Sequence, residues 1–375
     1  MNTRYPLSIA YFLVLSFFCG LFLWSCLDQI DFDVPQGLDE GLVVQASMVR
    51  GRPTIVEVQL NRLFNFTIPS LNQVNADQIF IWDEEGNSLE LTRRGIGFYT
   101  VGIPDNHPFF KIAHYKKYFL QILMPGGIEI VSAPEQLLPV PKADSISRRV
   151  EIQTVLNEDN EEVDDTLVAF YLHTPLTTEA NDIPTRFRIG AQRTYKITER
   201  PLSEFELANG FIRQTCYITS DVEVLVPQSF DGSISDASYL SNFPLPPDQL
   251  NHYYIEGYYY TAFLESLSEG AHRHFSELEQ TVQRTGSMFE SPVGRLFSNF
   301  TNLDNPKNTV YGYFYVTERS LVRKYIPTQT LVPNDTFCNR SVWLECPMPP
   351  CYPLACTACE MEPGSTIFPP EWWVE

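Results

Sequence analysis

Two strand-like runs lie in residues 41–60, which read GLVVQASMVRGRPTIVEVQL. Residues 50–53 (RGRP) separate the runs, and glycine and proline are typical of a turn. The second run, residues 55–60, alternates β-branched or aliphatic side chains with polar ones, which is the pattern of a half-buried strand. This stretch therefore predicts a β-fold that begins with two short strands joined by a turn.

Similar signals continue along the chain and predict a first β-domain over residues 41–142. Residues 78–92 have the pattern of a hairpin, with a glycine–asparagine pair in the reversal. Further strands are expected at residues 97–101 and 118–123. About seven strands at this spacing are typical of a small immunoglobulin-like β-sandwich. We expect the first domain to be such a sandwich, ending in a stiff, proline-containing linker at residues 138–141.

A second β-domain is predicted over residues 143–335. Strands at residues 147–155 and 167–173 flank the acidic stretch NEDNEEVDD, residues 157–165. This stretch lacks the ligand order of an EF-hand calcium loop, which favours a solvated hairpin tip over a calcium site. A long helix is expected over residues 260–285, because apolar residues there recur every three or four positions. They form one stripe: Leu264, Leu267, Ala271, Phe275, Leu278 and Val282.

The composition fits this β-rich interpretation. The chain has 375 residues, 44% of them hydrophobic and 19% charged, as in a folded protein long enough for two domains. Its 28 prolines and 13% aromatic residues favour strands and rigid loops over a helical bundle. Lysine and arginine total 26 against 46 aspartates and glutamates, a formal charge of −20, which argues against nucleic acid as a partner. The prediction is a mainly β protein with two sandwich-like domains and one long helix in the second.

The N-terminal segment predicts export and lipid attachment. Residues 7–24 carry no charge, as in the apolar part of an export signal or in a bilayer-spanning anchor. Residues 23–26 (LWSC) resemble a bacterial lipobox, in which a small residue precedes the cysteine that receives a lipid. We therefore expect residues 1–25 to be a lipoprotein signal peptide and Cys26 to be the lipidated start of the mature chain. The alternative is an uncleaved anchor.

Residues 26–40 are expected to form an acidic tether. Three aspartates lie within residues 28–33, and no basic residue accompanies them. This arrangement resembles the signal by which Bacteroidetes lipoproteins reach the outer face of the outer membrane. The alternative is a plain solvated tether on a lipoprotein that faces the periplasm. We expect a protein that is lipid-anchored in the outer membrane and faces the cell exterior.

A cysteine-rich C-terminal tail is expected over residues 336–375. Six of the eight cysteines follow the lipobox: Cys216, Cys338, Cys346, Cys351, Cys356 and Cys359. An even number in an exported chain predicts disulfides, and if all six pair with one another, one bond must join Cys216 to the tail. The spacing of the last four also fits a zinc site or, more weakly, a redox pair, but an oxidising environment favours disulfides.

No catalytic motif is evident in the sequence. It contains neither a His-Glu-x-x-His nor a Gly-x-Ser-x-Gly motif, and its six histidines show no nucleophile partner by spacing. We therefore predict a protein that is not an enzyme and that needs no metal or cofactor. A surface hydrolase remains an alternative, since the many carboxylates offer pairs whose separation the sequence does not give.

Tyrosines form the candidate ligand-binding residues. Residues 311–316 (YGYFYV) predict a strand with its tyrosines on one face, and a second tyrosine run lies at residues 258–260. Exposed rings of this kind stack on sugars or flat ligands, and the candidates are Tyr258, Tyr259, Tyr313 and Tyr315. The alternative is a sheet face that packs under a helix.

Several of these features together resemble the Bacteroidetes outer-membrane lipoproteins grouped as domain of unknown function 4249. They are the lipobox, the acidic tether, the β-rich first domain, GSMF at residues 286–289, YGYF at 311–314, and GST and PPEW at 364–366 and 369–372. Members are typically encoded beside TonB-dependent transporters. The resemblance implies a non-enzymatic surface lipoprotein that acts as an accessory or substrate-capture partner of such a barrel. The alternative is a surface glycan- or peptide-binding protein that acts without a dedicated barrel.

Overall fold

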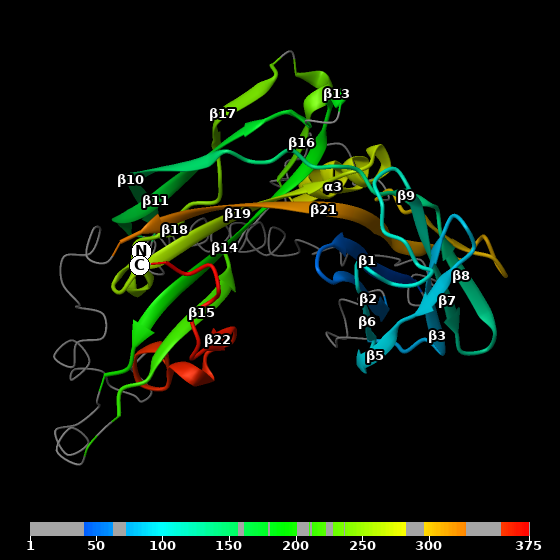
Figure 1. The fold of residues 1–375 in the computed structure, drawn as a ribbon, viewed down its shortest axis with the longest axis horizontal. Coiled ribbons are helices and arrows are strands. Elements are labelled where there is room, and N and C mark those ends of the chain that lie inside the picture. The colour runs from blue at the N-terminus through cyan, green and yellow to red at the C-terminus, as the bar shows by residue number, and fades with distance from the viewer. Residues whose placement is uncertain are drawn as a thin grey trace, which may run out of the picture. The chain divides into compact units, whose positions relative to one another are not determined.

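The structure is a computed structural model. It describes residues 41–62, 73–156, 161–178, 181–200, 210, 212–222, 228–235, 237–282, 296–327 and 354–374. The described part is mainly β, as predicted (Figure 1). The predicted signal peptide, the tether with Cys26, and three of the tail cysteines (Cys338, Cys346 and Cys351) lie outside the described residues.

The opening strands form as the sequence predicts. They are β1 (Leu42–Arg50) and β2 (Thr54–Arg62), which pair antiparallel. The sheet continues through β6 (Phe98–Ile103) to β5 (Thr92–Gly95). Alternate side chains of β1 and β2 point into a buried core, as the period of two requires.

A second sheet closes this first core. Its spatial order is β20 (Phe300–Asn302), β8 (Ile128–Ser132), β7 (Lys117–Met124), β3 (Gln78–Asp83) and β4 (Ser88–Glu90), with β9 (Glu135–Gln136) also paired to β7. Strands β3 and β4 are the hairpin predicted over residues 78–92. Inward-facing residues such as Ile79, Leu120 and Ile122 are fully buried in one cluster with Val56 and Val58 of the first sheet.

A 17-residue strand, β21 (Val310–Ile326), connects the strands around the first core to the strands that follow. Its first half pairs parallel with β1, and its second half pairs antiparallel with β19 (Tyr258–Ser266). Its residues Val310, Phe314 and Val316 lie in the first core together with Phe300. Residues 300–318, within the range expected for the second domain, thus complete the first core.

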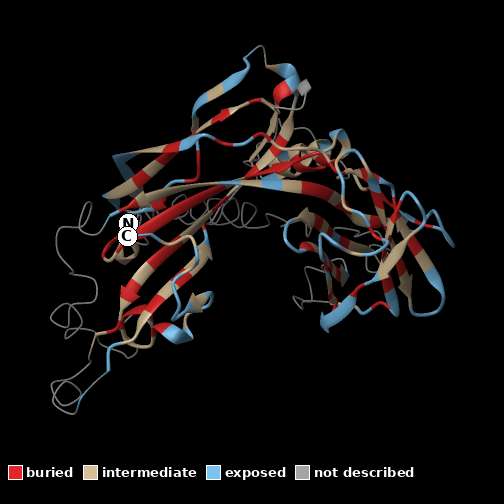
Figure 2. Ribbon diagram, in the orientation of Figure 1, coloured by how far each residue is buried: buried red, intermediate tan, exposed pale blue. Residues whose placement is uncertain are grey.

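The same sheet extends beyond β19. Next to it lie β14 (Arg186–Thr198), β15 (Thr215–Asp221) and β22 (Ser365–Thr366), and β16 (Gln228–Asp231) also pairs with β14. A separate sheet contains β10 (Ser145–Leu156), β11 (Glu162–Pro175), β17 (Tyr239–Pro244) and β18 (Asp248–Gln249). A second buried cluster joins these two sheets through rings such as Phe170, Phe187 and Tyr260. Figure 2 marks the buried residues of the strands in red. Two short strands, β12 (Thr177–Thr178) and β13 (Asn181–Pro184), pair apart from them.

The acidic stretch connects two paired strands. β10 and β11 are antiparallel, in register from Ser145–His173 to Leu156–Glu162, which agrees with the predicted hairpin. Of the acidic residues that the structure describes, Asp164 accepts a hydrogen bond from Thr154 (3.1 Å) and Asp165 accepts one from Gln249 (2.8 Å). These two carboxylates therefore stabilise strand contacts.

The predicted helix is wrong over residues 260–268, about its first third. Helix α3 spans Glu269–Val282, and the residues before it form strand β19. β19 is a central strand with β14 on one side and β21 on the other, and eight of its nine residues are buried. A strand buried on both faces shows no alternation of apolar and polar residues, so Leu264 matched the helical spacing by coincidence. Within the described residues, no helix is both long and apolar enough to cross a bilayer.

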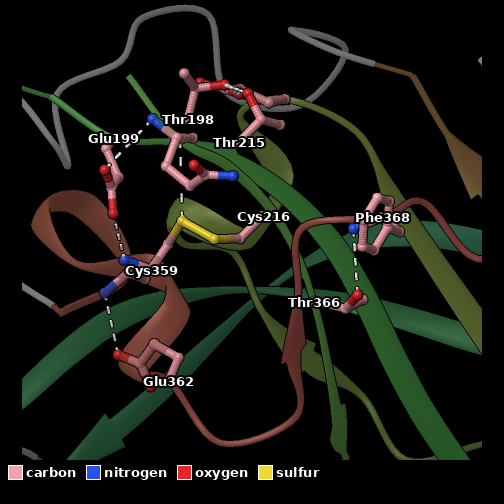
Figure 3. The surroundings of a disulfide bond; sticks show 11 residues. Thr198, Glu199, Thr215, Cys216, Cys359, Glu362, Thr366 and Phe368 are labelled. Carbon is pink, nitrogen blue, oxygen red and sulfur yellow. Dashed lines mark hydrogen bonds between the residues drawn. A yellow bond between two sulfur atoms is a disulfide. The ribbon is translucent and has the colours of Figure 1, made fainter. Parts of the chain in front are cut away.

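One disulfide ties the C-terminal segment to the sheet. Cys216 of β15 is bonded to Cys359 in the short helix η4 (Cys359–Met361), 143 positions away, with 5.9 Å between the Cα atoms (Figure 3). Both cysteines are fully buried, and the backbone N–H of Cys359 donates to Glu199 Oε1 (2.8 Å). The distribution of cysteines predicts this bond between Cys216 and the tail. Cys356, at the end of the short helix α5 (Leu354–Thr357), is also disulfide-bonded.

Stability should fall on mild acidification because of His252. This residue begins the short helix η3 (His252–Tyr254), and its ring packs edge-on against Tyr195 (5.9 Å between centroids). Burial, assisted by the charge of Arg193, lowers the pKa of His252 to about 4. The unfolded chain takes up this proton near pH 6.5, so stability is full above that pH and falls between about 6.5 and 4, by on the order of 3 kcal/mol. Urea unfolding at pH 7.5 and 4.5 measures the loss; an equal loss in a His252→Gln variant would contradict the assignment.

Candidate functional site

A cleft of about 700 Å³ lies between helix α3 and one face of the sheet formed by β1, β2 and β21. This is the face opposite the first core: on β21 the even-numbered residues point into the core and the odd-numbered tyrosines point to the cleft and the helix. Gln45, Glu57 and Tyr315 line the sheet side, and Phe275 and Leu278 line the helix side. The volume is in the usual range for small-molecule sites.

Tyr313 fixes the helix on the sheet. Its ring stacks on His274 of α3 (5.1 Å between centroids), and its hydroxyl donates to the Glu135 carboxylate. Gly270 makes this approach possible, because a Cβ atom there would overlap the Tyr313 hydroxyl. Ser268 donates to the other Glu135 oxygen (2.6 Å) while its own hydroxyl accepts from the N–H of Ala271, as an N-cap of α3. Strand β9, helix α3 and strand β21 therefore meet at one buried carboxylate.

Burial also sets the protonation of this group of side chains. Burial raises the pKa of Glu135, although the hydrogen bonds from Ser268 and Tyr313 favour its charged form. Burial and the neighbouring Glu135 raise the pKa of Tyr313 as well. Burial lowers the pKa of His274, whose Nδ1 is 2.6 Å from the carbonyl oxygen of Phe297, so this ring is neutral at pH 7.

A second polar cluster lies where the cleft borders the sheet. Arg188 of β14, Glu265 of β19 and Arg319 of β21 are direct cross-strand neighbours. The Glu265 side chain has no exposed surface and forms ion pairs with both guanidinium groups. Burial alone raises the pKa of Glu265, but the two positive charges and their hydrogen bonds outweigh it and hold this pKa below its usual range. Glu265 is therefore ionised at pH 7.

Aromatic rings hold the Arg188 side chain in place. Its Cζ atom lies 4.6 Å from the centroid of Phe275 and 5.3 Å from that of Tyr315, distances at which a cation is attracted to a ring face. Its Nη2 atom also donates to the Tyr315 hydroxyl (3.0 Å). Arg188 lines the cleft, but Glu265 and Arg319 do not. The guanidinium group of Arg188 therefore lines the cleft, whereas its partner, the carboxylate of Glu265, does not.

The predicted tyrosine site is only partly present. Tyr258, Tyr259 and Tyr313 are 0%, 8% and 4% exposed, so the expectation of exposed rings is wrong for these three. Tyr258 lies in the second core, where it donates to Asp248 (2.7 Å), and Tyr259 donates to the backbone oxygen of Val374 (2.8 Å). Tyr315 is half-buried and lines the cleft. For Tyr313 the alternative is confirmed, because this tyrosine of β21 packs under helix α3.

Arg188 and Phe275 were missed as site residues. Arg188 is a polar residue in the alternating strand β14, like the neighbouring Arg186, and nothing in the sequence separates the two. Phe275 belongs to the predicted apolar stripe of the helix, which indicates core packing and not a ligand site. The contact between the Arg188 guanidinium and the Phe275 ring forms only because the fold brings β14 and α3 together.

The described residues include two serine–histidine contacts outside the cleft. The longer one joins Ser276 Oγ to His272 Nε2 within helix α3 (3.4 Å). Ser147 Oγ of β10 is 2.9 Å from His173 Nε2 of β11. His173 Nδ1 accepts the N–H of Asn242 (3.5 Å). The ring nitrogen that a carboxylate orients in a catalytic triad thus faces a backbone amide here. In the described ranges, no cluster of three or more histidine, cysteine or carboxylate side chains is arranged to hold a metal ion.

The fold and the cleft define a mainly β, disulfide-bonded protein with a cleft of small-molecule size. Comparison with family profiles matches residues 28–320 to the family described as Domain of unknown function (DUF4249). The chain belongs to this family, as the sequence features suggest. A search of curated proteins finds no match.

Proposed function

We propose that the protein is a non-enzymatic binding lipoprotein of the Bacteroidetes outer membrane, lipidated at Cys26 and facing the cell exterior. In this role it captures a small ligand as the partner of a TonB-dependent transporter. The observation that carries the proposal is the aromatic cleft beside α3, with the fixed guanidinium of Arg188 at its border. The disulfide Cys216–Cys359 supports export, because such bonds persist in oxidising compartments.

The architecture supports a binding role over catalysis. Within the described lining of the cleft, Arg188 is held by Glu265 and Tyr315, and His274 is held by Phe297. Such groups bind and orient a ligand. We also propose that the first two sheets form an immunoglobulin-like sandwich, with residues 300–318 added to residues 41–142, and that the strands around the second core form another. The alternative function, glycan or peptide binding without a dedicated barrel, uses the same cleft.

Lipidation and partnership are tested together in cells. We expect metabolic labelling with an alkyne analogue of palmitate to mark the wild-type chain, and Cys26→Ala to abolish the label and release the protein from membranes. Cys19→Ala, inside the predicted signal peptide, is the matched control and should keep both. We expect a TonB-dependent barrel to co-purify after mild detergent extraction. A solitary, acylated monomer would contradict the partnership, and an unlabelled wild-type chain would contradict the anchor.

A further inference from the structure

We propose that the cleft binds a small organic carboxylate with a planar apolar body, whose carboxylate pairs with Arg188. This inference rests on the proposed capture function and names the class of its ligand. It follows from three properties of the cleft, namely the sign of its charge, the free hydrogen-bonding capacity of the guanidinium, and the aromatic walls beside it.

The first property is an excess of positive charge. The cluster of Arg188, Glu265 and Arg319 contains two guanidinium groups and one carboxylate, so it carries one uncompensated positive charge. The Glu265 side chain is fully buried, while that of Arg188 keeps 23% exposure and borders the cleft. Glu57 also lines the cleft, but it is exposed to solvent, which screens its charge. An anion at this end of the cleft therefore meets a guanidinium whose counter-charge is shared with a second arginine.

The second property is an unused face of the guanidinium. Nε of Arg188 donates to Glu265 (2.9 Å), and Nη2 donates to Glu265 and to Tyr315. Nη1 has no hydrogen-bond partner among the described residues. A guanidinium group already fixed by a carboxylate and two rings loses little conformational freedom when it binds a second anion. A ligand carboxylate is the acceptor that matches it.

The third property is the apolar, aromatic surroundings. Phe275 and Tyr315 stand against the guanidinium, and Tyr311, Phe98 and Leu278 extend the apolar lining along the cleft. A flat apolar body packs on such walls by aromatic contact and burial of apolar surface. The lining therefore fits one ligand that has a charged end and an apolar body, and fits poorly a ligand that is polar throughout, such as a free sugar.

A pair of isosteric compounds tests the charge requirement. The full-length protein in lipid nanodiscs is titrated calorimetrically with 2-naphthoate and with neutral 2-naphthamide, and empty nanodiscs serve as the blank. We expect naphthoate to bind at least about tenfold more tightly, which corresponds to one charge-assisted hydrogen bond. Equal affinities, or no binding of either compound, would overturn the proposal.

Two arginine variants place the carboxylate. Arg188→Gln and Arg319→Gln each leave Glu265 with one guanidinium partner, so both keep the buried charge balanced, but only Arg188 lines the cleft. We expect Arg188→Gln to abolish the preference for naphthoate and Arg319→Gln to keep it. An equal effect of both variants would contradict the assignment.

A second pair of variants does not disturb the buried cluster. Gln45 is exposed and lines the cleft, so Gln45→Glu and Gln45→Lys change its charge without affecting packing. We expect the first to weaken and the second to strengthen naphthoate binding by several-fold, with naphthamide unchanged; no difference would count against the proposal even if Arg188→Gln does not fold. Loss of ligand binding with the barrel still co-purifying would refute this inference alone, whereas ligand binding without a barrel would refute only the transporter partnership.

Discussion

Replacing Gly312 by alanine is expected to destabilise the protein by about 4 kcal/mol or more, enough to prevent accumulation of folded protein. Gly312 has φ of +98°, and a Cβ atom there would overlap the carbonyl oxygen of Val44. Val44 is its direct partner in the parallel pair of β1 and β21, and it is fully buried. Neither strand can move away without losing its ladder and its place in the core. Urea or thermal unfolding of the purified variant measures the loss.

Gly86→Ala is the matched control for Gly312→Ala. Gly86 also has a positive φ, +87°, but no atom lies within 4 Å of a Cβ built there. It carries the backbone strain of a left-handed residue without the clash, and we expect a loss of about 1 kcal/mol. If the two variants lost the same stability, the close approach of β1 and β21 would not be the cause.

Glu265→Gln is expected to cost about 3 kcal/mol, because it leaves two partly exposed guanidinium groups without their buried counter-charge. The side chain of Glu265 has no exposed surface and contacts both Arg188 and Arg319. Its lowered pKa gives the loss a pH signature. The carboxylate stabilises the fold above its unfolded pKa, about 4.5, and this contribution is lost as the pH falls through the lower pKa of the folded state. The variant should lack this part of the acid dependence.

Arg319→Gln provides the comparison for Glu265→Gln. It removes the excess charge and leaves the pair of Arg188 and Glu265 intact, so we expect a loss of less than about 2 kcal/mol. Denaturant unfolding of both variants at pH 7 measures the difference. A larger loss for Arg319→Gln than for Glu265→Gln would show that packing of the long side chain, and not charge balance, stabilises this cluster.

Local patterns in the sequence predicted local structure well. The alternation in β2, the turn between β3 and β4 and the hairpin of β10 and β11 all depend on neighbours along the chain, and all are present. The sequence of β19 predicts a helix because a strand buried on both faces shows no alternation of apolar and polar residues. The parallel pairing of β1 with β21 joins residues more than 260 positions apart, and no periodicity reports such a contact.

The site was harder to predict than the fold. The tyrosine face of β21 was recognised, but only the placement of α3 decides that Tyr313 is covered and Tyr315 borders a cleft. The place of Arg188 beside Glu265 depends on which strands are neighbours in the sheet, and the sequence does not give that order. By contrast, counting cysteines was enough to predict a bond between Cys216 and the tail, because only one cysteine lay far from the others. That inference needed no knowledge of the fold.

The length of β21 has a consequence for dissection of the molecule. Its first half is hydrogen-bonded to β1 and its second half to β19, so one continuous strand serves both. A break within this strand separates the residues that complete the first core, Val310, Phe314 and Val316, from Ile326 in the second core. Recombinant fragments should therefore be designed to retain residues 310–326 whole.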